Sequence, residues 1–106
     1  MNTNTAGLIG VGLLGSALAD RLIDDGVVVY GFDTNADQLT GLSQRGGIAC
    51  SSAEEVIAGC EILFLSLPTS EDVLSVVQQL RACFTAGQII VDTTTGAPAQ
   101  AIAVYP

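Results

Sequence analysis

Four glycines fall within the nine residues from Gly7 to Gly15, between a short apolar run and a segment with the periodicity of an amphipathic helix. Glycine in the interior of a strand or helix is destabilising by about 0.5–1 kcal/mol relative to alanine. The cluster therefore indicates a place where the backbone must adopt a conformation, or allow a close approach, that a side chain would prevent. A tight turn from a strand into a helix is such a place.

Short apolar runs alternate with amphipathic stretches along the whole chain. The runs predict strands at residues 6–10, 27–33, 48–50, 62–67 and 89–92. The stretches predict helices at residues 12–25, 35–45, 53–58 and 70–83, with another beginning within 98–104. Continuous apolar strands suit a parallel sheet that is buried on both faces. This order predicts an α/β fold with a doubly wound parallel sheet, and 106 residues suffice for one such domain.

Residues that favour helix ends support these boundaries. Gly26 follows the first predicted helix, where a left-handed glycine commonly ends a helix. Ser52 and Glu55 have the spacing of a capping box at the start of the third helix. Thr69 or Ser70 is expected to cap the fourth.

Composition and charge exclude several classes of protein. Hydrophobic residues make up 49% of the chain and charged residues 13%, which is typical of a globular domain. The net charge of −8 argues against nucleic-acid binding, which depends on lysine and arginine. The longest apolar stretch, residues 6–19, is shorter than the ~20 residues of a membrane span. The first residues lack the basic region of a signal peptide, so we expect a cytoplasmic protein.

The three cysteines, Cys50, Cys60 and Cys83, are widely spaced and form no C-x-x-C pair. The chain has no histidine, so a zinc site would lack its usual ligands. We therefore expect reduced thiols in the core and no metal.

The glycine cluster contains the pattern G-x-G-x-x-G at residues 10–15, directly after a predicted strand and at the start of a predicted helix. In this context the pattern predicts a dinucleotide-binding loop. The first glycine then allows a tight turn, the second lets the backbone approach a pyrophosphate, and the third lets helix and strand pack closely. The predicted cofactor-binding residues of this loop are Gly10, Val11, Gly12, Leu13, Leu14 and Gly15.

Asp33 ends the second predicted strand, 18 residues after Gly15, near the position expected of an acid that binds the adenosine ribose. Its carboxylate would accept hydrogen bonds from the ribose hydroxyls and repel a 2′-phosphate. Thr34 follows and offers no positive charge. These residues favour NAD over NADP. The alternative is a tight turn with a capping aspartate and no ligand.

Three segments resemble the β-hydroxyacid dehydrogenases, the family of 3-hydroxyisobutyrate, tartronate semialdehyde and 6-phosphogluconate dehydrogenases. "GLIGVGLLGSALADRLIDDG" is similar to the opening of the family, and "CEILFLSLPTSEDVLSVV" to its fourth strand and Leu-Pro turn. "GQIIVDTTTGAPAQ" resembles its fifth strand and the following Asp-x-Ser-Thr loop. The resemblance extends from Gly7 to about Ala103 and implies a Rossmann-like fold.

The resemblance also implies roles for residues outside the glycine loop. Leu67 and Pro68 would line the cofactor groove, and Thr95 would contact the nicotinamide side. Thr94 stands where the family has a serine that binds the substrate carboxylate, and Thr34 replaces the usual arginine. Without the other motifs, "DTTTGAP" would be read as a turn with a helix cap.

In the family a lysine acts as the general acid, and it would lie beyond Pro106; the chain itself contains no lysine. We therefore expect residues 1–106 to be the dinucleotide-binding domain of a longer enzyme, cut before an all-helical C-terminal domain and inactive alone. The full-length enzyme would transfer hydride between NAD and a small 3-hydroxy acid as a homo-oligomer. Two alternatives remain: a stand-alone NAD(H)-sensing module without catalysis, and an imine reductase of related fold.

Overall fold

The computed structural model describes residues 5–67, 69–85, 87–93 and 100–103. Its centre is one sheet with the strand order β3-β2-β1-β4-β5-β6. The strands are β1 (Thr5–Ile9), β2 (Val28–Phe32), β3 (Ile48–Ala49), β4 (Ile62–Leu65), β5 (Ile89–Asp92) and β6 (Gln100–Ala103). The first five pair in parallel, so the predicted doubly wound α/β fold is confirmed. β1 is central, with β2 on one side and β4 on the other.

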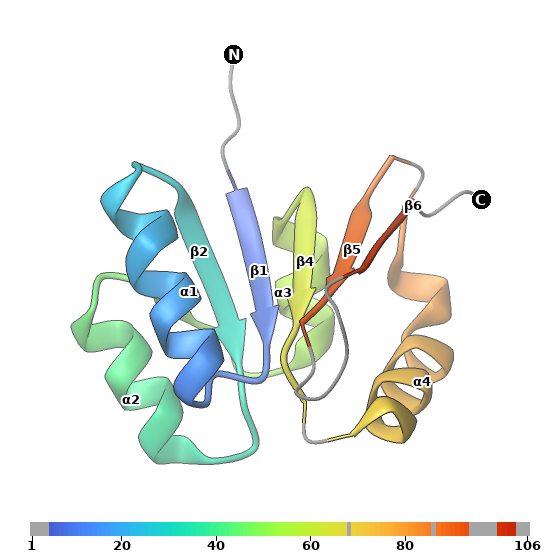
Figure 1. Cartoon of the computed structure of the whole chain (residues 1–106), viewed down its shortest axis with the longest axis horizontal. Coiled ribbons are helices and arrows are strands. Elements are labelled where there is room, and N and C mark those ends of the chain that lie inside the picture. Colours follow the sequence, from blue (N-terminus) through green and yellow to red (C-terminus); the bar gives the residue numbers. More distant parts are fainter. Residues whose placement is uncertain (1–4, 68, 86, 94–99, 104–106) are drawn as a thin grey trace.

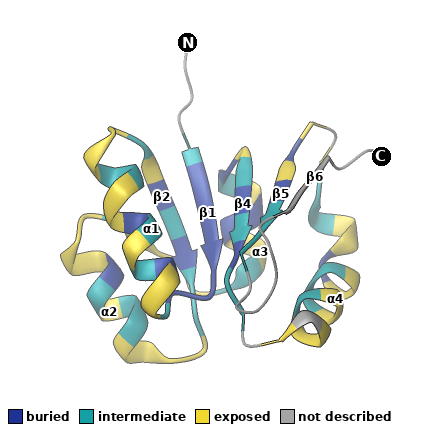
Figure 2. Ribbon diagram, viewed as in Figure 1, coloured by how far each residue is buried: buried dark blue, intermediate teal, exposed yellow. Residues whose placement is uncertain are grey.

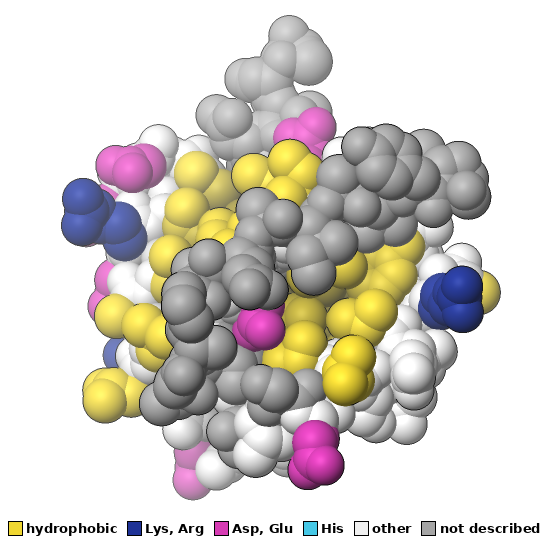
Figure 3. Space-filling view, turned by 45° about the vertical axis from the view of Figure 1, so that its right-hand side comes forward, with side chains coloured by type: hydrophobic (Ala, Val, Ile, Leu, Met, Phe, Trp, Pro, Cys, Tyr) yellow, Lys and Arg dark blue, Asp and Glu magenta, His cyan; other side chains and the backbone are white. Residues whose placement is uncertain are grey.

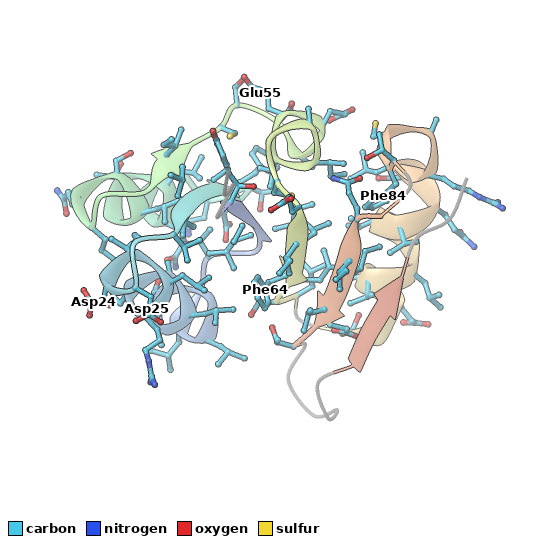
Figure 4. All side chains as sticks on the ribbon, turned by 90° about the horizontal axis from the view of Figure 1, so that it is seen from above. Asp24, Asp25, Glu55, Phe64 and Phe84 are labelled. Atoms are coloured by element: carbon cyan, nitrogen blue, oxygen red, sulfur yellow. The ribbon has the colours of Figure 1, made fainter. Side chains whose placement is uncertain are left out.

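Helices cover both faces of this sheet (Figure 1). They are α1 (Leu13–Asp24), α2 (Ala36–Gln44), α3 (Ala53–Gly59), α4 (Ser70–Gln79) and the short 3-10 helix η1 (Arg81–Cys83). One core lies under α1 and α2, and the other under α3 and α4. Figure 2 shows the buried residues concentrated in the strands between them. Phe64 packs against the first core and Phe84 against the second, and Figure 4 shows the two rings on opposite faces of the sheet.

Side chains and a glycine fix the helix ends as predicted, with one difference. Gly26 has a φ of +86° directly after α1. Thr69 caps α4, and the Ser52 hydroxyl accepts the N–H of Glu55 at 3.2 Å. The shortest bonds of the Glu55 carboxylate, however, come from the N–H and the hydroxyl of Ser51, both at 2.7 Å, one residue before the cap. The pKa of Glu55 is lowered by these bonds from Ser51.

The predicted helix at residues 98–104 is wrong. Residues Gln100–Ala103 form β6, which pairs antiparallel with β5 in the register Ile89↔Ala103 to Asp92↔Gln100. A short apolar run cannot be assigned to helix or strand by periodicity alone. Here the open edge of β5 decides, because its unpaired backbone groups offer a template for another strand.

One apolar face of the sheet is not covered by a helix among the described residues. On the α1 side of β4 and β5, Ile89 is 38% exposed, while Phe64 and Val91 are half-buried. Figure 3 shows hydrophobic side chains gathered on this part of the surface. None of the described helices has the length and hydropathy that crossing a bilayer requires.

The cysteines differ in burial, which predicts selective thiol reactivity. Cys50 and Cys60 are buried and Cys83 is half-buried, and all three are free. Burial raises the pKa of Cys50, and it raises the pKa of Cys60 to about 11. Because the thiolate is the reactive form, we expect Ellman's reagent at pH 8 to modify Cys83 rapidly in the folded domain. All three should react in denaturant, and rapid reaction of all three in the folded state would contradict the placement.

Candidate functional site

A cleft of about 950 Å³ opens at the carboxyl edge of the sheet. The floor of the cleft is formed where the chain leaves β1 and β4, which are neighbours in the sheet. From β1 the chain continues to β2 on one side, and from β4 it continues to β5 on the other side. Open α/β sheets bind ligands at this kind of switch point. The lining residues are Ile9, Gly10, Gly12, Leu13, Leu14, Ala17, Phe32, Asp33, Thr34, Ser51, Ser52, Ala53, Glu54, Ser66, Leu67, Val76, Gln79 and Leu80.

Two glycines of the loop after β1 are required by the packing of the protein itself. Gly10 has a φ of +96°, and a Cβ there would overlap the carbonyl oxygen of Ser66 in the chain after β4. A Cβ on Gly15 would overlap the carbonyl oxygen of Gly10. The tight turn predicted at Gly10 is therefore present, and Gly15 of α1 packs closely against the residue that directly follows β1.

Gly12 differs from these two, because none of the described residues requires a glycine there. Its φ is −80°, which any residue adopts, and a Cβ would meet no atom of the described residues within 4 Å. Gly12 lies at the N-terminus of α1 and lines the cleft. The missing side chain leaves free space directly over the first turn of the helix, where a ligand could reach the backbone.

The N-terminus of α1 also lacks a side-chain cap. Among the α-helices of the described residues, it is the one whose N-cap makes no side-chain hydrogen bond, and its first turn has no acidic residue. In α2, α3 and α4 the side chains of Asn35, Ser52 and Thr69 each accept a backbone N–H. The first N–H groups of a helix need a partner and carry partial positive charge. At α1 this end is available to an anion in the cleft.

Asp33 joins the glycine loop to the end of β2. One carboxylate oxygen accepts the N–H of Val11 at 2.8 Å, and the other accepts the N–H of Asn35 at 2.8 Å. These bonds, which no pattern in the sequence predicts, fix the position of the carboxylate. A carboxylate oxygen has two lone pairs, so Asp33 still has acceptor capacity for a ligand.

The structure brings most of the predicted site residues together. Those that line the cleft are Gly10, Gly12, Leu13, Leu14, Asp33, Thr34 and Leu67. Val11 does not, because its side chain is fully buried under α1 and its N–H is bonded to Asp33. Gly15 packs behind the loop, against the carbonyl of Gly10. Pro68, Thr94 and Thr95 lie outside the described residues, so their roles stay predictions.

The lining residues that were not predicted include Ile9, Ala17 and Phe32 on elements next to predicted ones, and three further groups. Ser51–Glu54 follow β3, and their place beside Asp33 could have been found from the order of the strands, since β3 pairs with β2. Ser66 directly precedes the predicted Leu67. Val76, Gln79 and Leu80 lie near the C-terminus of α4, and no sequence pattern indicates that this end reaches the cleft.

Among the described residues, no group of His, Cys, Asp and Glu side chains could hold a metal ion.

Comparison with known proteins agrees with this geometry. Residues 5–105 match the model of a protein family described as the NAD binding domain of 6-phosphogluconate dehydrogenase. Over 100 residues the chain is 34% identical to 2-(hydroxymethyl)glutarate dehydrogenase from Eubacterium barkeri, covering 91% of this chain and 33% of that protein. It is 29% identical over 103 residues to a probable mitochondrial 3-hydroxyisobutyrate dehydrogenase from Dictyostelium discoideum, covering 94% of this chain and 32% of that protein.

Two solved structures are also similar. Mycobacterium tuberculosis 3-hydroxyisobutyrate dehydrogenase with L-serine superposes with a TM-score of 0.84 at 26% identity, covering 89% of this chain and 32% of that one. An imine reductase from Pseudomonas sp. superposes with a TM-score of 0.81 at 25% identity, covering 91% of this chain and 34% of that one. The chain thus spans about a third of the length of the relatives it matches.

Proposed function

This chain belongs to the family of the NAD-binding domain of 6-phosphogluconate dehydrogenase, and from that premise we propose that its cleft holds NAD as part of a dehydrogenase of small 3-hydroxy acids. The observation that carries the proposal is the N-terminus of α1. It is uncapped by any side chain and lies beneath the open space at Gly12. The names of the two curated relatives, both hydroxyacid dehydrogenases, support the substrate class.

The residues of the cleft fit a dinucleotide. Backbone N–H groups at the start of α1 supply the partial positive charge that a pyrophosphate needs, which lets an acidic chain bind an anion. The fixed carboxylate of Asp33 offers its remaining lone pairs to ribose hydroxyls. Leu13, Leu14 and Leu67 supply apolar contact surface in the cleft.

When bound, NAD supplies the hydride acceptor for oxidation of the alcohol. The role of this chain is to bind and orient the cofactor, and the resemblance implies that Thr94 contacts the substrate and Thr95 the nicotinamide side. The chain has no lysine. We infer that proton transfer depends on a lysine beyond Pro106, in a second, helical domain of a homo-oligomeric enzyme.

Calorimetric titration of the chain with NADH and NADPH tests the binding proposal. We expect NADH to bind at least about tenfold more tightly, because the extra 2′-phosphate meets the charge of Asp33 with no cation to offset it. Equal or tighter binding of NADPH would contradict the assignment of Asp33. Binding of neither nucleotide would contradict the proposed function.

A second candidate is imine reduction, which the similarity to the Pseudomonas enzyme favours. The cofactor domain would be the same and the substrate different. Assays of the full-length protein with 3-hydroxy acids and with cyclic imines separate the two candidates. NAD-dependent turnover of hydroxy acids without imine reduction would support the dehydrogenase, and the reverse result would support the reductase.

A further inference from the structure

Two helices begin at the cleft, and their N-termini differ in charge. Gly12, Leu13 and Leu14 at the start of α1 line it, as do Ser52 and Glu54 at the start of α3. The start of α1 has no side-chain cap and no acid, as described above. The first turn of α3 contains two acids, Glu54 and Glu55, and its cap is a serine. The N-terminus of α1 therefore favours an anion, whereas the two carboxylates at the N-terminus of α3 repel one.

The two acids of α3 have different surroundings. The carboxylate of Glu55 accepts two hydrogen bonds of 2.7 Å from Ser51. Figure 4 labels Glu55 at the start of the helix. Glu54 lines the cleft, and its side chain makes no hydrogen bond or ion pair with any other described residue. Its charge is therefore not offset by a neighbour in that part of the chain.

Strand pairing brings Glu54 to the same end of the cleft as Asp33. β2 and β3 run parallel with Gly31 opposite Ala49, and the N–H of Cys50 donates to the carbonyl of Gly31 at 2.8 Å. The segments that follow both strands thus leave the sheet at one edge, and both line the cleft. Asp33 is held there by its two backbone hydrogen bonds and has little freedom to turn away from an added charge.

No positive side chain offsets these two acids at the cleft. The chain has three arginines, Arg21, Arg45 and Arg81, all within the described residues, and none lines the cleft. Arg45 pairs with Asp20 of α1 at 3.0 Å. The end of the cleft beside β2 and β3 is therefore negative, while the end at α1 accepts negative charge.

We propose that Glu54 is a second determinant of cofactor choice, which together with Asp33 excludes the 2′-phosphate of NADP from the end of the cleft beside β2 and β3. The inference rests on the proposed function, since it concerns how the same cleft distinguishes two forms of one cofactor. Uncharged ribose hydroxyls are tolerated beside Glu54, whereas a phosphate of charge near −2 is repelled. The charge pattern also sets the orientation of the cofactor in the cleft, with its pyrophosphate at α1 and its adenosine ribose toward α3.

The test compares Glu54→Gln with Glu71→Gln. Glu71 occupies the same position of α4, two residues after its cap, but does not line the cleft. Both variants remove one charge from an exposed first turn. In calorimetric titrations at low ionic strength, Glu54→Gln should tighten NADPH binding by about threefold to tenfold and change NADH binding less than about twofold. Glu71→Gln should leave the ratio of the two affinities at its wild-type value.

Salt provides the second readout. Because the effect is electrostatic across solvent, the gain from Glu54→Gln should fall below about twofold in 0.5 M salt. An unchanged NADPH-to-NADH ratio in Glu54→Gln, or an equal change in Glu71→Gln, would overturn the inference while leaving the proposed function intact. Wild-type protein that binds neither nucleotide would overturn both.

Discussion

Replacing Gly10 with alanine is expected to destabilise the domain by about 2–5 kcal/mol and to abolish NADH binding. The backbone at Gly10 has a φ of +96°, which costs a residue with a side chain about 1–3 kcal/mol. The new methyl group would also overlap the carbonyl oxygen of Ser66, so the chains after β1 and β4 would have to separate. Thermal melts followed by circular dichroism should show a midpoint lower by about 10–30 °C.

Gly12→Ala is the matched control, because it adds the same methyl group two residues away. Within the described part of the chain no atom would lie within 4 Å of the new methyl group, and the φ of −80° is ordinary, so the melting midpoint should stay within about 3 °C of wild type. NADH binding should still weaken by about tenfold or more if the pyrophosphate lies over α1. A Gly10→Ala variant as stable as wild type would contradict the loop geometry. Wild-type affinity in Gly12→Ala would contradict the phosphate position.

Gln88→Leu is expected to destabilise the domain by about 3 kcal/mol or more without changing the cleft. Gln88 is the buried polar residue that joins the end of α3 to the start of β5. Its side-chain amide donates to the carbonyls of Ile57 and Cys60, both at 2.8 Å, and accepts the N–H of Thr85 at 2.7 Å. Leucine would remove all three bonds and leave the carbonyl of Ile57 only its long contacts with Cys60. Urea titration should give a lower midpoint with an unchanged slope.

Gln78→Leu provides the comparison for this second prediction. The chemical change is identical, but Gln78 is exposed on α4, so the free energy of unfolding should change by less than about 0.5 kcal/mol. A third variant, Gln88→Glu, keeps the size of the side chain but directs a carboxylate oxygen at two carbonyls. It should be destabilised at least as much as Gln88→Leu at neutral pH. Equal stability of Gln88→Leu and wild type would show that the three hydrogen bonds do not hold this junction together.

Most of the fold could be predicted because its signals are local. The glycines after β1, the apolar runs and the capping residues Ser52 and Thr69 each act within a few residues, and the structure has them in those places. β6 could not be predicted in this way. Whether "QAIA" forms a helix or a strand is decided by the free edge of β5, which lies about ten residues earlier in the chain.

In the candidate site, too, local features could be predicted from the sequence and contacts between distant segments could not. Gly10, Gly12 and Asp33 were found because a turn and a strand end have recognisable spacing, and all three line the cleft. No local pattern marks Glu54, because its place at the cleft depends on the pairing of β3 with β2. The hydrogen bond between Val11 and Asp33 joins residues 22 apart, and the sequence of neither segment predicts it.

The contact between Gly10 and Ser66 also bears on how the domain is made. The glycine loop is synthesised early, but it packs against the carbonyl of Ser66, 56 residues further along the chain, and the N–H of Ser66 donates to the carbonyl of Ile9 at 3.0 Å. At about 5–20 residues per second, a ribosome needs about 3–11 s to deliver that partner. During this interval β1 and β2 can emerge from the ribosome, but the segment after β4 that completes the floor of the cleft has not yet been synthesised. The nascent chain should therefore gain the ability to bind a nucleotide only after β4 has left the exit tunnel.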